Sequence, residues 1–150
     1  MRHLRSDHDP KGALAQIDEH DRRFPEGTLK REAALARAEA LLALERKASA
    51  LAVLDGLKLE GTAVDRRVEL ARAELRAARG RHIEAMHDFD DVLKRSVGDD
   101  IGGRALFGRA VLRVGAGDIV GARDDLREYL RRADCPRRSE AERTLRRLGG

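Results

Sequence analysis

A short pattern of a small residue followed by a large apolar residue recurs along this chain, and it constrains the fold more than any other feature. The pattern is clearest in GRHIEAMHDFDDVL at residues 80–93. Its small residue recurs as Ala13, Ala50, Ala85 and Ala122, at intervals of 37, 35 and 37 residues. Self-similarity at such a period is the signature of stacked helical hairpins, each burying its apolar face against its neighbours. The repeat therefore predicts an all-α fold.

The composition agrees with helices that have charged surfaces and aliphatic seams. Charged residues make up 39% of the chain and hydrophobic residues 41%, but aromatics only 3%. With three Phe, one Tyr and no Trp, the chain has too few rings for a stacking platform that binds single-stranded nucleic acid. The single cysteine excludes an intrachain disulfide and a cysteine-based zinc cluster. No apolar run has the length of a signal peptide core or a membrane span, so we expect a cytoplasmic protein without a membrane partner.

Apolar spacing and capping residues place the helices within one domain, 1–150. We predict a helix at 11–24, hairpins at about 29–57, 63–95 and 104–132, and a C-terminal capping helix at 137–148. Asp9 with Pro10, and Thr62, are predicted to open helices. Ser139 and Glu142 form the pattern of a capping box. Ile83 is predicted to point inward, and residues 96–103, rich in Gly and Asp, are predicted to form a loop.

The repeat resembles the tetratricopeptide repeat (TPR) family. The resemblance lies in GRHIEAMHDF at 80–89, in AGDIVGARDDL at 116–126, in Pro25 at the family's closing proline, and in Ala110 at its small first-helix position. It implies a right-handed α-solenoid of about 3.5 repeats plus the capping helix. The chain differs from the family in its period, which is about 34 residues there. It also lacks the first-helix aromatic residue and has Glu45 in place of a turn glycine.

The same resemblance implies a non-catalytic module that binds a peptide or partner protein. First helices of the family line a groove, and the candidate groove residues here are Arg37, Arg67, Glu74 and Arg104. The chain has no Asn, so the Lys/Asn clamp that some members use for a C-terminal carboxylate cannot be built. DRRFPEG at 21–27, followed by a charged Ala/Leu helix, is similar to repeats of bacterial envelope and signalling proteins.

The N-terminal helix resembles the second helix of a repeat whose first helix is missing. Leu14, Ile17 and Phe24 would then form an edge that needs a cover, because terminal repeats normally have a polar outer face. We expect either that the chain is a piece of a longer protein or that it forms a homo-oligomer through this edge.

The net charge of +4 comes from the C-terminal segment, where seven arginines face three carboxylates. These arginines are Arg131, Arg132, Arg137, Arg138, Arg143, Arg146 and Arg147. A nucleic-acid contact through them is the alternative function. Since Arg outnumbers Lys throughout the chain, a coding bias is the favoured explanation of their number, and nucleic acid is not the expected partner.

Catalytic and metal-binding patterns are weak. Glu84 and His87 have the i, i+3 spacing of ligands in di-iron bundles, but such a site needs that pair twice. No His accompanies a Ser or Cys nucleophile in a known motif. We therefore expect no catalytic residues, no bound metal and no cofactor.

Overall fold

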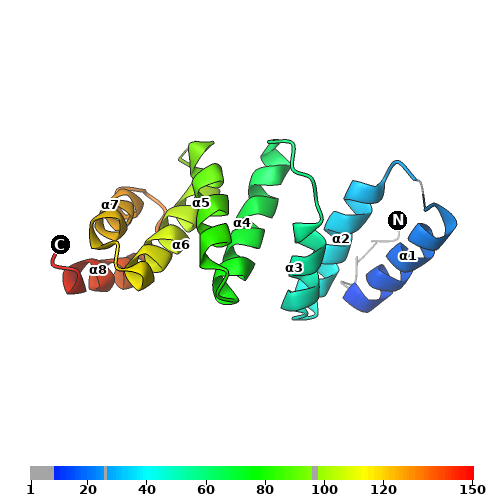
Figure 1. Cartoon of the computed structure of the whole chain (residues 1–150), viewed down its shortest axis with the longest axis horizontal. Coiled ribbons are helices and arrows are strands. Elements are labelled where there is room, and N and C mark those ends of the chain that lie inside the picture. Colours follow the sequence, from blue (N-terminus) through cyan, green and yellow to red (C-terminus); the bar gives the residue numbers. More distant parts are fainter. Residues whose placement is uncertain (1–8, 26, 96–97) are drawn as a thin grey trace, which may run out of the picture. The chain divides into compact units, whose positions relative to one another are not determined.

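In the computed structural model, which describes residues 9–25, 27–95 and 98–150, all regular secondary structure is α-helix (Figure 1). The described residues contain no strands. The helices are α1 (Pro10–Arg23), α2 (Lys30–Ala43), α3 (Lys47–Asp55), α4 (Ala63–Ala78), α5 (His82–Lys94), α6 (Asp100–Ala116), α7 (Ile119–Leu130) and α8 (Arg138–Arg147). The all-α prediction is confirmed.

The helices gather into two compact units, Met1–Lys58 and Leu59–Gly150. In the first unit, α1 packs on α2 and α2 on α3. In the second unit, each helix from α4 to α8 packs on the next one, and α4 also contacts α6. A single domain over 1–150 stays a prediction.

Two predicted helix starts are confirmed by their hydrogen bonds. The Asp9 side chain accepts from the Lys11 N–H, with Pro10 at the first helical position. Thr62 and Asp65 form a reciprocal capping box at the start of α4, in which the buried Asp65 carboxylate accepts from the Thr62 N–H at 2.8 Å. Such caps satisfy N–H groups that have no partner within the helix.

One predicted helix start and one predicted cap are wrong. Helix α6 begins at Asp100 rather than after Gly103, because Asp99 caps it by accepting from the Gly102 N–H at 3.0 Å. Residues 96–97 of the predicted loop lie outside the described residues. The predicted capping box of α8 does not form, because Ser139 lies inside the helix. The helix begins at Arg138, close to the predicted residue 137, after a turn in which the Arg138 N–H donates to the Cys135 carbonyl.

The turn between the two helices of each hairpin is built in the same way three times. Glu45, Gly80 and Gly117 all have positive φ, at 56°, 76° and 78°. In each turn this residue donates its N–H to the carbonyl three residues back, and the next residue donates to the carbonyl five residues back. This pair of bonds is the Schellman motif. The repeat found in the sequence is therefore also a repeat of backbone structure.

Glu45 is in a left-handed conformation that favours glycine, so Glu45→Gly is expected to stabilise the protein by about 0.5–1 kcal/mol. The exposed ion pair of Glu45 with Lys47 contributes little against this gain. Thermal unfolding followed by circular dichroism measures the effect. Arg46→Gly is the matched control: Arg46 has φ −84°, so glycine should destabilise there. Equal effects at both positions would contradict the prediction.

The core of the second unit contains the small and large apolar residues of the repeat together with residues of the first helices. Phe89 is 1% exposed and packs with Leu70, Val92 and Ala105. Ile83 is 88% exposed, so its predicted burial is wrong. The reason is helical geometry: Ala85 and Phe89 define the inward face of α5, and Ile83 lies nearly opposite Ala85.

Candidate functional site

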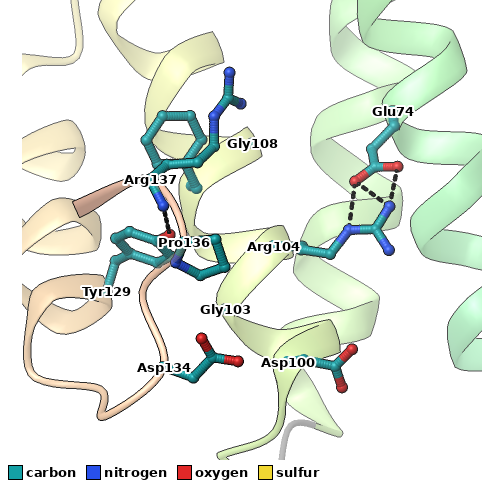
Figure 2. A pocket seen from close by; sticks show the side chains of 10 residues that line it. Glu74, Asp100, Gly103, Arg104, Gly108, Tyr129, Asp134, Pro136 and Arg137 are labelled. Carbon is teal, nitrogen blue, oxygen red and sulfur yellow. Dashed lines mark hydrogen bonds and ion pairs between the residues drawn. The ribbon is translucent and has the colours of Figure 1, made fainter. Parts of the chain in front are cut away.

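A pocket of about 540 Å³ lies in the second unit, along helix α6, and we call it the α6 pocket (Figure 2). It is bounded by α4, by the end of α7 and by the connection to α8. Its lining residues are Glu74, Asp100, Gly103, Arg104, Phe107, Gly108, Tyr129, Asp134, Pro136 and Arg137. The volume is within the range of about 300–1,000 Å³ common for ligand sites.

Two aromatic rings lie at the base of the α6 pocket. Phe107 of α6 and Tyr129 of α7 have ring centroids 5.4 Å apart in a tilted arrangement, and both are nearly buried. The Arg137 guanidinium lies 4.5 Å above the centre of the Phe107 ring, and the Arg137 backbone N–H donates to the Tyr129 hydroxyl at 3.0 Å. These contacts give the pocket a fixed apolar base.

An ion pair between two predicted groove residues forms one wall. Arg104 of α6 donates to both carboxylate oxygens of Glu74 of α4, at 2.6–3.1 Å (Figure 2). The two residues are 30 positions apart in the chain. The structure therefore brings Glu74 and Arg104 together, and their charges balance.

Two further carboxylates flank Gly103 at one end of the pocket (Figure 2). Asp100 comes from the first turn of α6, and Asp134 from the connection before α8. Both are exposed, and neither accepts a side-chain hydrogen bond within the described residues. An added Cβ on Gly103 would lie 3.6 Å from Cδ and 3.9 Å from Nη1 of Arg132, and 3.9 Å from the Tyr129 ring, so Arg132 and Tyr129 both pack against this buried glycine.

Next to Asp100 in the sequence, Asp99 joins α4 to α6. Arg66 donates to both Asp99 oxygens, at 2.8 and 3.0 Å. The Arg66 guanidinium lowers the pKa of Asp99 to about 2, against the effect of burial and with help from the Gly102 N–H. Arg132 of the end of α7 donates to the Asp99 carbonyl at 2.7 Å. Arg132 also packs against Gly103, which lines the pocket.

A smaller hollow of about 380 Å³ continues along α6 and shares Glu74 and Gly108 with the α6 pocket. Its walls are mainly apolar, with Ala77 and Ala78 on α4 and the exposed Val111 on α6. The two hollows therefore adjoin each other at these shared residues of α4 and α6.

Sequence reasoning missed a repeated charge cluster, which we call the Arg–Asp clamp. Arg72 and Arg76 of α4 hold Asp88 of α5, with hydrogen bonds of 2.7–3.0 Å. In the next hairpin, Arg109 and Arg113 of α6 hold Asp125 of α7 through the same atoms at 2.6–3.0 Å. All three positions recur exactly one repeat, 37 residues, later. This common interval was the signal that could have revealed the clamp.

Of the other predicted groove residues, Arg37 has a different role. It donates to Asp18 and Asp21, at 2.6 and 2.9 Å, and so joins α2 to α1. Arg67 is exposed on α4 and lies outside the α6 pocket.

The predicted N-terminal edge is partly covered. Leu14 and Ile17 are half-buried, and Phe24 is 57% exposed beside the His20 ring. Self-association through this edge stays a prediction.

The basic C-terminal residues are divided among different contacts. Arg131 pairs with Glu128, Arg137 with Glu140 and Arg138 with Glu142, while Arg132 donates to the Asp99 carbonyl. Arg143, Arg146 and Arg147 remain on α8, around a shallow hollow that also contains Glu140. These seven arginines therefore do not form one continuous surface of unpaired charge.

Glu84 and His87 have different neighbours. Glu84 accepts from Arg81 at 2.6–2.7 Å, and His87 lies 3.2 Å from the Asp91 carboxylate. Among the described residues, no three His, Cys, Asp or Glu side chains are grouped as a metal site would require. In the same part of the chain, no helix combines the length and apolarity needed to cross a membrane.

No protein-family model matches this chain, and neither the curated proteins nor the solved structures give a match.

Proposed function

We propose that this protein is a non-catalytic interaction module that binds a peptide segment of a partner protein in the α6 pocket. The observation that supports this proposal is the aromatic base formed by Phe107 and Tyr129 inside a pocket open to solvent. Rigid rings at the base of a pocket are typical anchoring sites for the apolar side chain of a partner.

The repeated turns and clamps favour a solenoid for the chain as a whole. We propose a right-handed α-solenoid of about 3.5 TPR-like repeats with α8 as its C-terminal cap. The groove then lies between first helices, where the TPR resemblance would place it. The stacking of α4 to α8 and the contact between α4 and α6 support this arrangement within the second unit.

Tyr129 offers a direct test, because the chain contains one Tyr and no Trp. Peptides of about twelve residues, without Tyr and Trp, are selected on the full chain from a randomised display library. Binding in the α6 pocket is expected to change the fluorescence of Tyr129. Gly103→Leu, whose side chain would displace Arg132 or Tyr129 at the pocket wall, is expected to weaken the binding of the selected peptides at least about tenfold, equal to about 1.4 kcal/mol.

Arg67→Leu is the control, because it introduces the same side chain on the exposed surface of α4 outside the pocket. The Arg67→Leu variant should bind the selected peptides with the same affinity, and with the same change in Tyr129 fluorescence, as the unchanged protein. Circular dichroism verifies that both variants are folded. Peptides that bind without altering the Tyr129 signal would place the interface elsewhere, and failure to select any peptide would count against an interaction module.

The nucleic-acid alternative has weaker support, because most of the C-terminal arginines already have partners. It would require strongly salt-dependent binding through Arg143, Arg146 and Arg147.

A further inference from the structure

Three arginines on the exposed side of α8 have no opposite charge beside them. Arg143, Arg146 and Arg147 are exposed, and no carboxylate among the described residues lies within ion-pair distance of them. Both carboxylates of the helix are engaged by arginines at its start. This surface, which we call the α8 basic face, therefore carries three positive charges that no other residue of the described chain neutralises.

The spacing of these arginines makes the uncompensated charge unfavourable. Arg146 and Arg147 follow Arg143 by three and four residues, so both are its neighbours on the helix surface. Like charges at these spacings repel one another and lower the stability of a helix. The position of two of them in the last turn of α8 offsets part of this repulsion, because cations interact favourably with the dipole at a helix C-terminus. An anionic partner bound to the α8 basic face would remove the repulsion.

The α8 basic face adjoins the α6 pocket. Arg137 lines the α6 pocket, and Glu140 lines the shallow hollow of about 630 Å³ around the three arginines. The Arg137 guanidinium and the Glu140 carboxylate lie 3.0 Å apart, so this ion pair borders both sites. Since α8 has 10 residues, it is only about 15 Å long. A segment bound in the α6 pocket therefore needs about five further residues in extended conformation to pass along α8.

We propose that the partner segment bound in the α6 pocket continues along α8, where its Asp or Glu residues pair with Arg143, Arg146 and Arg147. This inference rests on the proposed function and specifies the partner's chemistry. Guanidinium groups suit such a segment, because each can donate two parallel hydrogen bonds to one carboxylate. A nucleic acid fits this face less well. Three arginines neutralise fewer phosphates than the roughly six to ten contacts of strongly salt-dependent duplex binders, and the chain has too few rings to stack single-stranded bases.

The peptides selected on the full chain test this inference through their composition and their dependence on the three arginines. We expect them to be enriched in Asp or Glu on one side of a large apolar residue. The triple variant Arg143→Gln, Arg146→Gln, Arg147→Gln is expected to bind the strongest synthetic peptide about tenfold more weakly, since each exposed charge pair contributes a small amount. The affinity of the unchanged protein should also fall severalfold between about 50 and 500 mM salt.

The matched control is a second triple variant, Arg46→Gln, Arg67→Gln, Arg79→Gln. These three arginines are also exposed and also have no ion pair in the described part of the chain, so the two triple variants have the same net charge. The control variant should bind the peptide with the affinity of the unchanged protein, which separates pairing on α8 from a general effect of charge. Thermal unfolding followed by circular dichroism verifies that both triple variants are folded at the temperature of the binding measurement.

Peptides that alter Tyr129 fluorescence but are neutral or basic, or that bind the two triple variants with equal affinity, would overturn this inference and leave the proposed function standing. Absence of any peptide with a Tyr129 response would overturn both. A DNA duplex of about 20 base pairs serves as the nucleic-acid probe. If the unchanged protein binds this duplex more tightly than the peptides at low salt, and only the α8 variant loses this binding, the face belongs to nucleic acid and the acidic segment is overturned.

Discussion

Asp125→Ala is expected to destabilise the second unit by about 2–3 kcal/mol. The Asp125 carboxylate is 4% exposed and accepts three hydrogen bonds from Arg109 and Arg113. Alanine would leave two largely buried guanidinium groups without this partner, and loss of one member of a buried pair commonly costs about 3–5 kcal/mol. We expect a smaller loss, because Arg109 keeps its contact with Asp90 and Arg113 has partial access to water.

The neighbouring residue provides the control for Asp125. Asp124 is 68% exposed and lies 3.7 Å from Arg127, so Asp124→Ala should change the free energy of unfolding by less than about 0.5 kcal/mol. Urea unfolding followed by Tyr129 fluorescence measures both variants, because Tyr129 lies in the same helix as the clamp carboxylate. If the two variants lose equal stability, the clamp does not hold the hairpin together.

The sequence predicted the helices well because their signals are local. Apolar periodicity located the hairpins, and Asp9 and Thr62 marked helix starts through bonds to residues two or three positions away. The predictions that failed involved competing local interactions. Ser139 has the right spacing for a cap, but α8 begins at Arg138 after a turn at Cys135. Ile83 is apolar, but its position on the helix faces water.

The candidate site was harder to predict because it depends on contacts between distant segments. Arg67 and Arg104 occupy equivalent positions 37 residues apart, but only Arg104 lines the α6 pocket. The difference comes from the connection between α7 and α8, which supplies Asp134 and Pro136 as a wall. Nothing in the repeat pattern specifies where that connection lies.

The Arg–Asp clamp was not predicted for a different reason. In a chain with 31 basic and 27 acidic residues, many charged residues have an opposite charge at a suitable spacing in the sequence. The spacing alone therefore does not predict which of them form an ion pair. Only comparison of the first helices in the same register distinguishes Arg72 and Arg109 from the surrounding arginines. Alignment on the small and apolar residues of the second helices did not include them.

Gly108 is the position in the second unit where we expect an added side chain to lower the free energy of unfolding most. An added Cβ would lie 2.5 Å from Cζ and 2.8 Å from Cε1 of Phe89. The Phe89 ring is 1% exposed and packs in the core with Leu70, Val92 and Ala105, so moving it would disturb these contacts. Overpacking of this kind costs about 1–3 kcal/mol, which exceeds the gain of about 1 kcal/mol in helix propensity from Gly to Ala.

Gly108→Ala is therefore expected to destabilise the protein by about 1–2 kcal/mol, and the larger Gly108→Val by about 3 kcal/mol or more. Gly115→Ala is the control within the same helix. No atom lies within 4 Å of its added Cβ, so only the propensity gain remains and the variant should be more stable. The same substitution thus has opposite expected signs at two positions of α6, as measured by urea unfolding.

A double-mutant cycle separates the contact with Phe89 from other effects of the new methyl group. Phe89→Leu alone loses packing in the core, but it removes the ring atoms that the Gly108→Ala methyl group would meet. The double variant should therefore be more stable than the sum of the two single losses predicts. If the two single losses in the free energy of unfolding simply add in the double variant, the new methyl group does not act through the Phe89 ring. The close approach of α6 to α5 would then not depend on this glycine.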